Sequence, residues 1–218
     1  MAAAVSDTLT PERLLVCGTG NRKKGAELAE LLAPWGFTLQ TLADYPQAIE
    51  VDESGTSFAE NAALKATQQA AHLHAWVLAD DSGLVVDALD GKPGVYSARY
   101  AGPGATDELN RRKLMEELAG VELSRRTARF VCHVALSDPT GRVRAEASGA
   151  CHGRIITDER GGHGFGYDPL FEVIEYRRTF GELGPAVKTV LSHRARAVGA
   201  LLPALVSLAA KGEWGARG

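Results

Sequence analysis

Leu14-Leu15-Val16-Cys17-Gly18-Thr19-Gly20-Asn21 contains the pattern that most clearly indicates the fold class. Its first four residues form a short apolar run, which predicts a buried strand, and the two glycines that follow favour a turn. A helical pattern comes next, in which Leu28, Leu31 and Leu32 share one face, and it ends near Pro34. A strand, a glycine-containing turn and a helix in this order predict an α/β fold.

The rest of the chain continues to alternate between strand and helix patterns. Ser57-Phe58-Ala59-Glu60 has the form of a capping box, and it predicts an alanine-rich helix that runs to about His74. Trp76-Val77-Leu78-Ala79 predicts a buried strand that ends at Asp80-Asp81-Ser82-Gly83. The remaining predictions are a strand at 37–42, an extended stretch at 84–86, a helix at 107–118, extended segments at 127–137 and 142–155 joined by a turn at 138–141, a loop at 161–168 and a helix at 192–210.

The composition is that of an ordinary globular protein, with 45% hydrophobic and 23% charged residues among 218. We expect one domain at 14–210, a disordered extension at 1–13 and a C-terminal tail at 211–218. The formal net charge of −3 argues against a broad basic face for duplex nucleic acid, although a few cations can converge on a small anion. Three dispersed cysteines, no leader pattern and no long apolar run predict a cytoplasmic protein without a membrane segment.

Thr19-Gly20-Asn21-Arg22-Lys23-Lys24 is a candidate phosphate-binding turn. Glycine lets the backbone approach a ligand, and a helix that begins near Asn21 directs free N–H groups towards it, while Lys23 or Lys24 adds positive charge. The segment is not a Walker loop, because the Gly-Lys-Ser/Thr ending is missing, and Lys23 replaces the third glycine of a dinucleotide fingerprint. A strand-to-helix turn that Asn21 caps would explain the same residues.

Asp80 and Asp81 are candidate ligands of a hard cation such as Mg²⁺. They follow a predicted buried strand, and ligands commonly bind at strand ends in α/β sheets. Because successive residues of an extended chain point in opposite directions, we expect only one of the two to face the site. The alternative is an acidic turn that Ser82 and Gly83 close.

A polar group is expected on the helix that follows Ser57. Asn61 and Lys65 lie one turn apart on it, whereas Glu60 is explained by the cap. Glu53, in the preceding segment, has by itself the character of a surface loop residue.

Gly162-His163-Gly164-Phe165-Gly166-Tyr167-Asp168-Pro169 is a candidate base-binding loop. A flexible backbone beside an aromatic face suits a stacked base, and Asp168 can accept hydrogen bonds from ring N–H groups. The alternative is a structural loop with Phe165 and Tyr167 packed inward.

Lys188, His193 and Arg194 lie at or near the start of the last predicted helix. Cations at a helix N-terminus are unfavourable for the helix dipole, so this placement indicates an anion or a partner carboxylate. A solvated surface is the alternative.

The order of these motifs is more specific than any one of them. The chain contains, in sequence, Thr-Gly-Asn-x-x-Lys, Ser-Phe-x-Glu-Asn-Ala, Ala-Asp-Asp-Ser-Gly-Leu, Pro-Gly-Val-Tyr-Ser-Ala-Arg-Tyr, Gly-Phe-Gly-Tyr-Asp-Pro and Ser-His-Arg. In these it closely resembles the inosine/xanthosine triphosphate pyrophosphatase family, from about Leu14 to about Leu205. One departure is Val187, since the family usually has an acidic residue just before the lysine that matches Lys188.

The resemblance implies a mixed α/β fold with a central elongated sheet flanked by helices, and two lobes with a nucleotide cleft between them. It also implies a magnesium-dependent homodimer that hydrolyses ITP, dITP and XTP to monophosphate and pyrophosphate, which keeps deaminated purines out of DNA and RNA. By motif, Asp81 would be the catalytic acceptor and a metal ligand, and Glu53 the other metal ligand. The implied substrate-binding residues are Thr19, Gly20, Asn21, Arg22, Lys23, Lys24, Ser82, Phe165, Gly166, Tyr167, Asp168, Lys188, His193 and Arg194.

The expected chemistry is attack of water on the α-phosphorus, with Mg²⁺ offsetting charge and Asp81 or a neighbour deprotonating the water. A donor paired to the purine 6-keto oxygen would be left unsatisfied by adenine, at a cost of about 1–3 kcal/mol. The rival functions are a pyrophosphatase for pyrimidine or modified nucleotides and a nucleotide-binding sensor without turnover. A nucleic-acid-binding module is disfavoured by the net charge.

Overall fold

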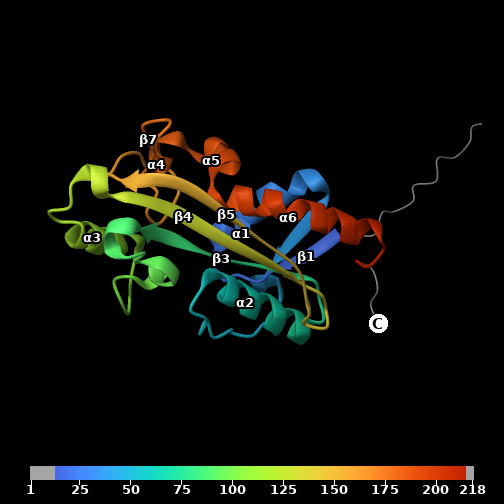
Figure 1. Cartoon of the computed structure of the whole chain (residues 1–218). Coiled ribbons are helices and arrows are strands. Elements are labelled where there is room, and N and C mark those ends of the chain that lie inside the picture. Colours follow the sequence, from blue (N-terminus) through green and yellow to red (C-terminus); the bar gives the residue numbers. More distant parts are fainter. Residues whose placement is uncertain (1–12, 215–218) are drawn as a thin grey trace, which may run out of the picture.

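The computed structural model describes residues 13–214, which form a seven-stranded sheet with helices on both faces (Figure 1). The strand order is β2-β1-β3-β4-β5-β6-β7. β1 is parallel to β2 and to β3, and every other pair in the sheet is antiparallel. This mixed sheet with flanking helices confirms the predicted fold class.

Most of the longer elements lie where the sequence predicts them. The strands are β1 (Arg13–Cys17), β2 (Phe37–Thr41), β3 (Val77–Val86), β4 (Thr127–Ser137), β5 (Val143–Ile155), β6 (Phe171–Val173) and β7 (Arg178–Thr179). The helices are α1 (Arg22–Leu32), α2 (Phe58–Leu73), α3 (Asp107–Glu117), α4 (Phe180–Leu183), α5 (Pro185–Leu191) and α6 (His193–Ala210). The capping box of α2 is present, because the Ser57 hydroxyl accepts a hydrogen bond from the Glu60 N–H at 3.2 Å and the Glu60 carboxylate accepts one from the Ser57 N–H at 3.1 Å.

Consecutive residues of the central strands pack against different helices. Leu78 of β3 lies opposite Leu136 of β4, and both join a cluster with the leucines of α1 and α6. The next pair, Ala79 and Ala135, packs instead against two alanines of α2. The sheet is therefore covered by α2 on one face and by α1 and α6 on the other (Figure 1), as the two-residue period of a strand requires.

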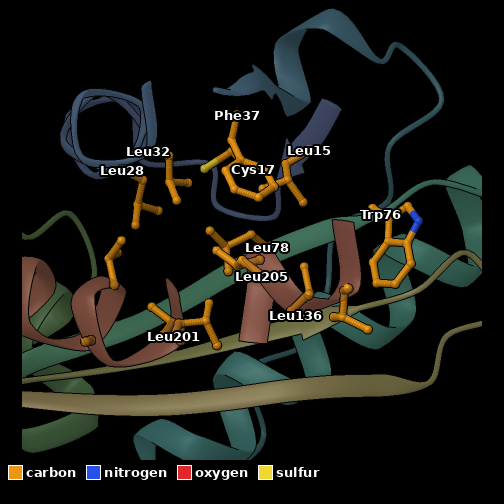
Figure 2. Packing of buried hydrophobic residues seen from close by; sticks show 14 of the residues in the cluster. Leu15, Cys17, Leu28, Leu32, Phe37, Trp76, Leu78, Leu136, Leu201 and Leu205 are labelled. Carbon is orange, nitrogen blue, oxygen red and sulfur yellow. The ribbon is translucent and has the colours of Figure 1, made fainter. Parts of the chain in front are cut away.

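Two hydrophobic clusters lie at different ends of the long strands. The first joins β1 and the beginning of β3 to α1 and α6 (Figure 2). The second joins the later part of β3 and the beginning of β4 to α3, α4 and β6. On β3, Leu78 belongs to the first cluster and Leu84 to the second, and the polar stretch from Asp80 to Gly83 lies between them. The clusters form the cores of the two predicted lobes.

β3 is longer than predicted. It does not end at Asp80 but continues to Val86, because its ladder with β4 runs without a break from the pair Val77–Ser137 to the pair Val86–Ala128. The aspartates are thus inside a strand, so the prediction that they follow a strand end is wrong.

The ends of the domain also differ from the predicted boundaries. β1 already begins at Arg13, and residues 1–12 of the predicted extension lie outside the described part of the chain. Of the predicted tail, 211–214 are described, and Trp214 is buried, stacked on Trp76 with ring centroids 4.5 Å apart. No helix between residues 13 and 214 is both long and apolar enough to cross a membrane.

Candidate active site

The turn between β1 and α1 borders a pocket. The Asn21 side-chain oxygen accepts hydrogen bonds from the backbone N–H groups of Lys23 at 3.0 Å and Lys24 at 3.2 Å. The side chains of Asn21 and Lys24 line the pocket, whereas Arg22 and Lys23 are exposed. The capping role of Asn21 is therefore confirmed, and it brings the N-terminus of α1 to the edge of the pocket, where a phosphate would gain from the helix dipole.

The edge of β3 that faces β1 is open beyond Leu78. β1 ends at Cys17, and its ladder with β3 ends at the pair Cys17–Leu78. Between Asp80 and Gly83, no strand of the described chain pairs with this edge, whereas the other edge of β3 pairs with β4 along its whole length. A ligand that lies across the open edge can reach side chains on both faces of the sheet.

Asp80 lies on the face covered by α1 and α6, where it is completely buried among cations. Its Oδ2 accepts hydrogen bonds from Arg194 Nε at 3.2 Å and Nη2 at 3.0 Å, and Lys24 Nζ lies 3.9 Å away. Although burial favours the neutral acid, the charges of Lys24 and Arg194 hold the pKa of Asp80 well below its usual value. Asp80 therefore acts as a permanent anion that fixes two cations at the pocket.

Asp81 lies on the opposite face, beneath α2. Its Oδ1 accepts a hydrogen bond from Lys65 Nζ at 3.1 Å, and its Oδ2 lies 3.4 Å from Asn61 Nδ2. Lys65 Nζ also donates to Glu53 Oε2 at 3.2 Å. Burial raises the pKa of the Asp81 carboxyl, and the positive charge of Lys65 opposes this effect without cancelling it. The two aspartates point in opposite directions, as predicted, and each has its own polar cluster.

An open pocket lies on the Asp80 side. Both lobes contribute to it, because Phe130 of the second cluster and Asn110 of α3 line it together with Lys24 of α1. Glu53 and Asp81 do not line it; they lie on the other side of the open edge of β3. The predicted substrate residues that line it are Asn21, Lys24, Ser82, Phe165, Gly166, Tyr167, Asp168, Lys188, His193 and Arg194.

Asp168 fixes the predicted base-binding loop. Its buried Oδ2 accepts hydrogen bonds from the Phe165 N–H at 2.8 Å and from Lys188 Nζ at 2.7 Å. A Cβ atom at Gly164 would lie 2.0 Å from the same oxygen, and Gly164 has a φ of +81°, so only glycine fits there. Burial raises the pKa of Asp168, although the charge of Lys188 opposes the shift.

The two aromatic residues of this loop have different environments. Tyr167 is buried and its hydroxyl donates to the Ser97 carbonyl at 2.9 Å, which is the inward packing that the sequence also allowed. Phe165 stays at the pocket, with the Lys188 ammonium 4.3 Å from its ring centroid. Phe165 is thus the aromatic surface left for a ligand.

Glu27 of α1 links two of the predicted substrate cations. Its Oε1 lies 2.9 Å from Lys188 Nζ, and its Oε2 pairs with Arg194. The prediction that a partner carboxylate explains a cation at the start of the last helix is therefore confirmed. His193 stacks on Phe130 with centroids 4.9 Å apart, and burial together with the charges of Arg194 and Lys188 lowers its pKa, so the imidazole is neutral.

Several residues of the site were not assigned by sequence reasoning. Asn61 and Lys65 had a signal, since their helical spacing places them on one face, but no partner could be named. Glu27 had no signal in the sequence, because its partner Arg194 lies 167 positions further along the chain. Of the predicted residues, Thr19, Gly20, Arg22 and Lys23 belong to the turn but do not line the pocket.

The chain is similar to known proteins over most of its length. The sequence model described as the Ham1 family matches residues 15–204. A dITP/XTP pyrophosphatase from Rhodopirellula baltica is 56% identical, covering 89% of this chain and 93% of that protein, and one from Geobacter sulfurreducens is 51% identical, covering 86% and 94%. The structure of a HAM1 protein from Coxiella burnetii is similar with a TM-score of 0.80 at 37% identity, covering 89% of this chain and 98% of that one.

Proposed function

Because this chain belongs to the Ham1 family, we propose that it hydrolyses the non-canonical purine nucleotides ITP, dITP and XTP to the monophosphate and pyrophosphate. The enzyme class and substrate class agree with those expected from the sequence. The observation that carries the proposal is the similarity to dITP/XTP pyrophosphatases over most of both chains, joined to a pocket beside a helix N-terminus that contains buried cations. Removal of such nucleotides would keep deaminated purines out of DNA and RNA.

Asp81 and Glu53 fit a magnesium ion by the chemistry of their donor atoms. Both are carboxylates that already share one cation, since Lys65 Nζ lies 3.1 Å from Asp81 and 3.2 Å from Glu53. Within residues 13–214 no cluster of three or more metal-binding side chains occurs. Mg²⁺ is commonly held by one or two carboxylates with waters and substrate phosphates, so two suffice. When bound, the ion would offset the charge of the phosphates as pyrophosphate leaves.

Asp81 is proposed as the group that orients and deprotonates the attacking water. Asn61 and Lys65 hold the two carboxylate oxygens from α2, so the group has a defined orientation. The proton would pass from the water to Asp81, and the resulting hydroxide would attack the α-phosphorus.

The triphosphate is proposed to lie along the turn 19–24 and across the open edge of β3. Lys24 would contribute charge from the pocket side, together with N–H groups at the start of α1. Ser82 lies on this edge, where its hydroxyl accepts a hydrogen bond from Arg194 at 2.9 Å and donates one to Asp80 Oδ2 at 3.1 Å. The same hydroxyl could donate to a phosphate oxygen instead. This path connects the pocket with Asp81 on the other face.

The base is proposed to stack on Phe165 with its 6-keto oxygen near a cationic donor. Lys188 and Arg194 are buried cations that line the pocket. Adenine carries an amino donor at position 6, so it would leave such a donor unsatisfied, at a cost of about 1–3 kcal/mol. Guanine shares the keto group, so its exclusion must depend on the 2-amino group.

We further propose that the enzyme is a cytoplasmic homodimer. Exposed Tyr96, Ile174, Tyr176 and Val190 provide apolar surface that a second copy could cover. The three cysteines are free and buried, which suits a reducing compartment. Light scattering would test the dimer, since a monomeric mass at micromolar concentration would contradict it.

The deciding experiment is a substrate panel with Mg²⁺ and product identification. ITP, dITP and XTP should give monophosphate and pyrophosphate, with little turnover of ATP, GTP, CTP or UTP, and EDTA should abolish the reaction. Preferred cleavage of pyrimidine nucleotides would support the rival pyrophosphatase instead. Binding without any turnover would support the sensor.

A further inference from the structure

Two side chains of helix α3 form hydrogen bonds with one glycine of the base-binding loop, Gly166. The backbone N–H of Gly166 donates to Asp107 Oδ2 at 2.9 Å, and the Gly166 carbonyl accepts from Arg111 Nη1 at 2.9 Å. Asp107 and Arg111 are four positions apart, so one face of α3 supplies both contacts. One hydrogen bond fixes the peptide group before the Gly166 Cα atom and the other fixes the peptide group after it. Both backbone torsions of Gly166 are therefore constrained.

These two torsions, together with the hydrogen bond from the Phe165 N–H to Asp168, set the position of Phe165 relative to the rest of the loop. Gly166 has a φ of +61°, a conformation that only glycine adopts easily, and open space surrounds the position of its missing Cβ. The residues after it are anchored separately, by the Tyr167 hydroxyl and by the Asp168 carboxylate. Phe165 is held as well, because its backbone N–H donates to Asp168 Oδ2 at 2.8 Å, so Gly166 lies between two anchored residues.

Arg111 is itself held in place. Its Nε donates to Glu159 Oε1 at 2.7 Å while Nη1 reaches Gly166, and its side chain is mostly buried. Asp107 lines the pocket and lies 3.7 Å from Lys23 Nζ, on the turn at the other side of the pocket. The neighbouring Arg112 is exposed and contacts only Glu116 on its own helix, at 3.9 Å, among the described ion pairs. Arg111 is therefore held by contacts outside its own helix, whereas the ion pair of Arg112 lies within α3.

We propose that Asp107 and Arg111 are positioning residues for base recognition: they fix the peptide groups of Gly166 and thereby hold Phe165 and Asp168 in the geometry that receives the purine. The inference rests on the proposed function, because it takes the pocket at Phe165 to be the base site. Neither residue touches the reacting atoms, so their loss should weaken binding of the base more than it slows the chemical step.

The test compares Arg111→Ala with Arg112→Ala by calorimetric titration of IMP and of pyrophosphate, which requires no turnover. Arg111→Ala should raise the Kd of IMP about tenfold, as expected for loss of a charged hydrogen bond, and leave the Kd of pyrophosphate unchanged. Arg112→Ala should change neither value. With XTP as substrate, Arg111→Ala should raise KM by a similar factor while kcat stays within about threefold.

A second pair of variants, at Asp107, separates the contribution of the hydrogen bond from that of the negative charge. Asp107→Asn keeps an acceptor for the Gly166 N–H and should bind IMP nearly as the wild type does, whereas Asp107→Ala should resemble Arg111→Ala. Equal IMP affinities for Arg111→Ala, Arg112→Ala and the wild type would overturn the positioning role, and so would equal losses for IMP and pyrophosphate. Wild-type protein that binds IMP but does not hydrolyse XTP would refute the proposed function alone, while absence of IMP binding would overturn both.

Discussion

Asp80 and Asp81 are neighbours on one strand, yet their surroundings differ in almost every respect. Asp80 faces α1 and α6 and is bound by the guanidinium of Arg194, with Lys24 nearby. Asp81 faces α2 and contacts one ammonium and one amide. Burial favours the neutral acid at both positions, but two fixed cations reverse the effect at Asp80 and lower its pKa, whereas the pKa of Asp81 is raised.

The chemical role of each carboxylate therefore depends on the face of the strand from which it projects, since the residue type is the same. An aspartate held ionised between fixed cations is a poor proton acceptor and a good counterion. An aspartate whose pKa is raised can take a proton during the reaction. The structure therefore supports a structural role for Asp80 beside the catalytic role proposed for Asp81.

The largest expected effect tests the Asp81 side of this comparison. Asp81→Asn should lower kcat by about 10³-fold, because removal of a general base typically costs 10²- to 10⁴-fold. Nucleotide binding should remain measurable, since the pocket at Phe165 is untouched. Steady-state kinetics with XTP and a binding titration would check this, and near-wild-type turnover would refute the role of Asp81.

The second-largest effect tests the structural role of Asp80. Asp80→Asn should lower the free energy of unfolding by about 3 kcal/mol, because it leaves the buried Arg194 with less countercharge. Asp81→Asn should cost much less stability, so the two variants serve as controls for each other. Urea denaturation would measure both, and equal stability losses would remove the distinction drawn between the two faces.

The smallest effect concerns the lysines of the phosphate turn. Lys24 faces Asp80 and the pocket, whereas Lys23 is exposed. Lys24→Ala should raise KM for XTP about tenfold with a smaller change in kcat, as expected for loss of a charged contact, and Lys23→Ala should have less effect. An unchanged KM for Lys24→Ala would argue against contact with the triphosphate.

The α/β class, most of the longer helices and strands, and the order of the motifs along the chain could be predicted from local sequence patterns. These features depend on neighbouring residues: the capping box at Ser57 needs only Glu60, and the alternation of β3 makes Asp80 and Asp81 diverge whatever surrounds them. The family resemblance depends on the same local patterns, and the comparisons confirmed it.

Tertiary structure alone decided the length of β3, the partner of each aspartate and the link from α3 to Gly166. β3 continues past the aspartates because β4 pairs with it along its whole length, a contact between segments about 50 positions apart. Arg194 reaches Asp80 and Glu27 only after α6 packs beside α1 on the same face of the sheet. Such contacts follow from the packing of distant segments, and no local pattern of residues encodes them.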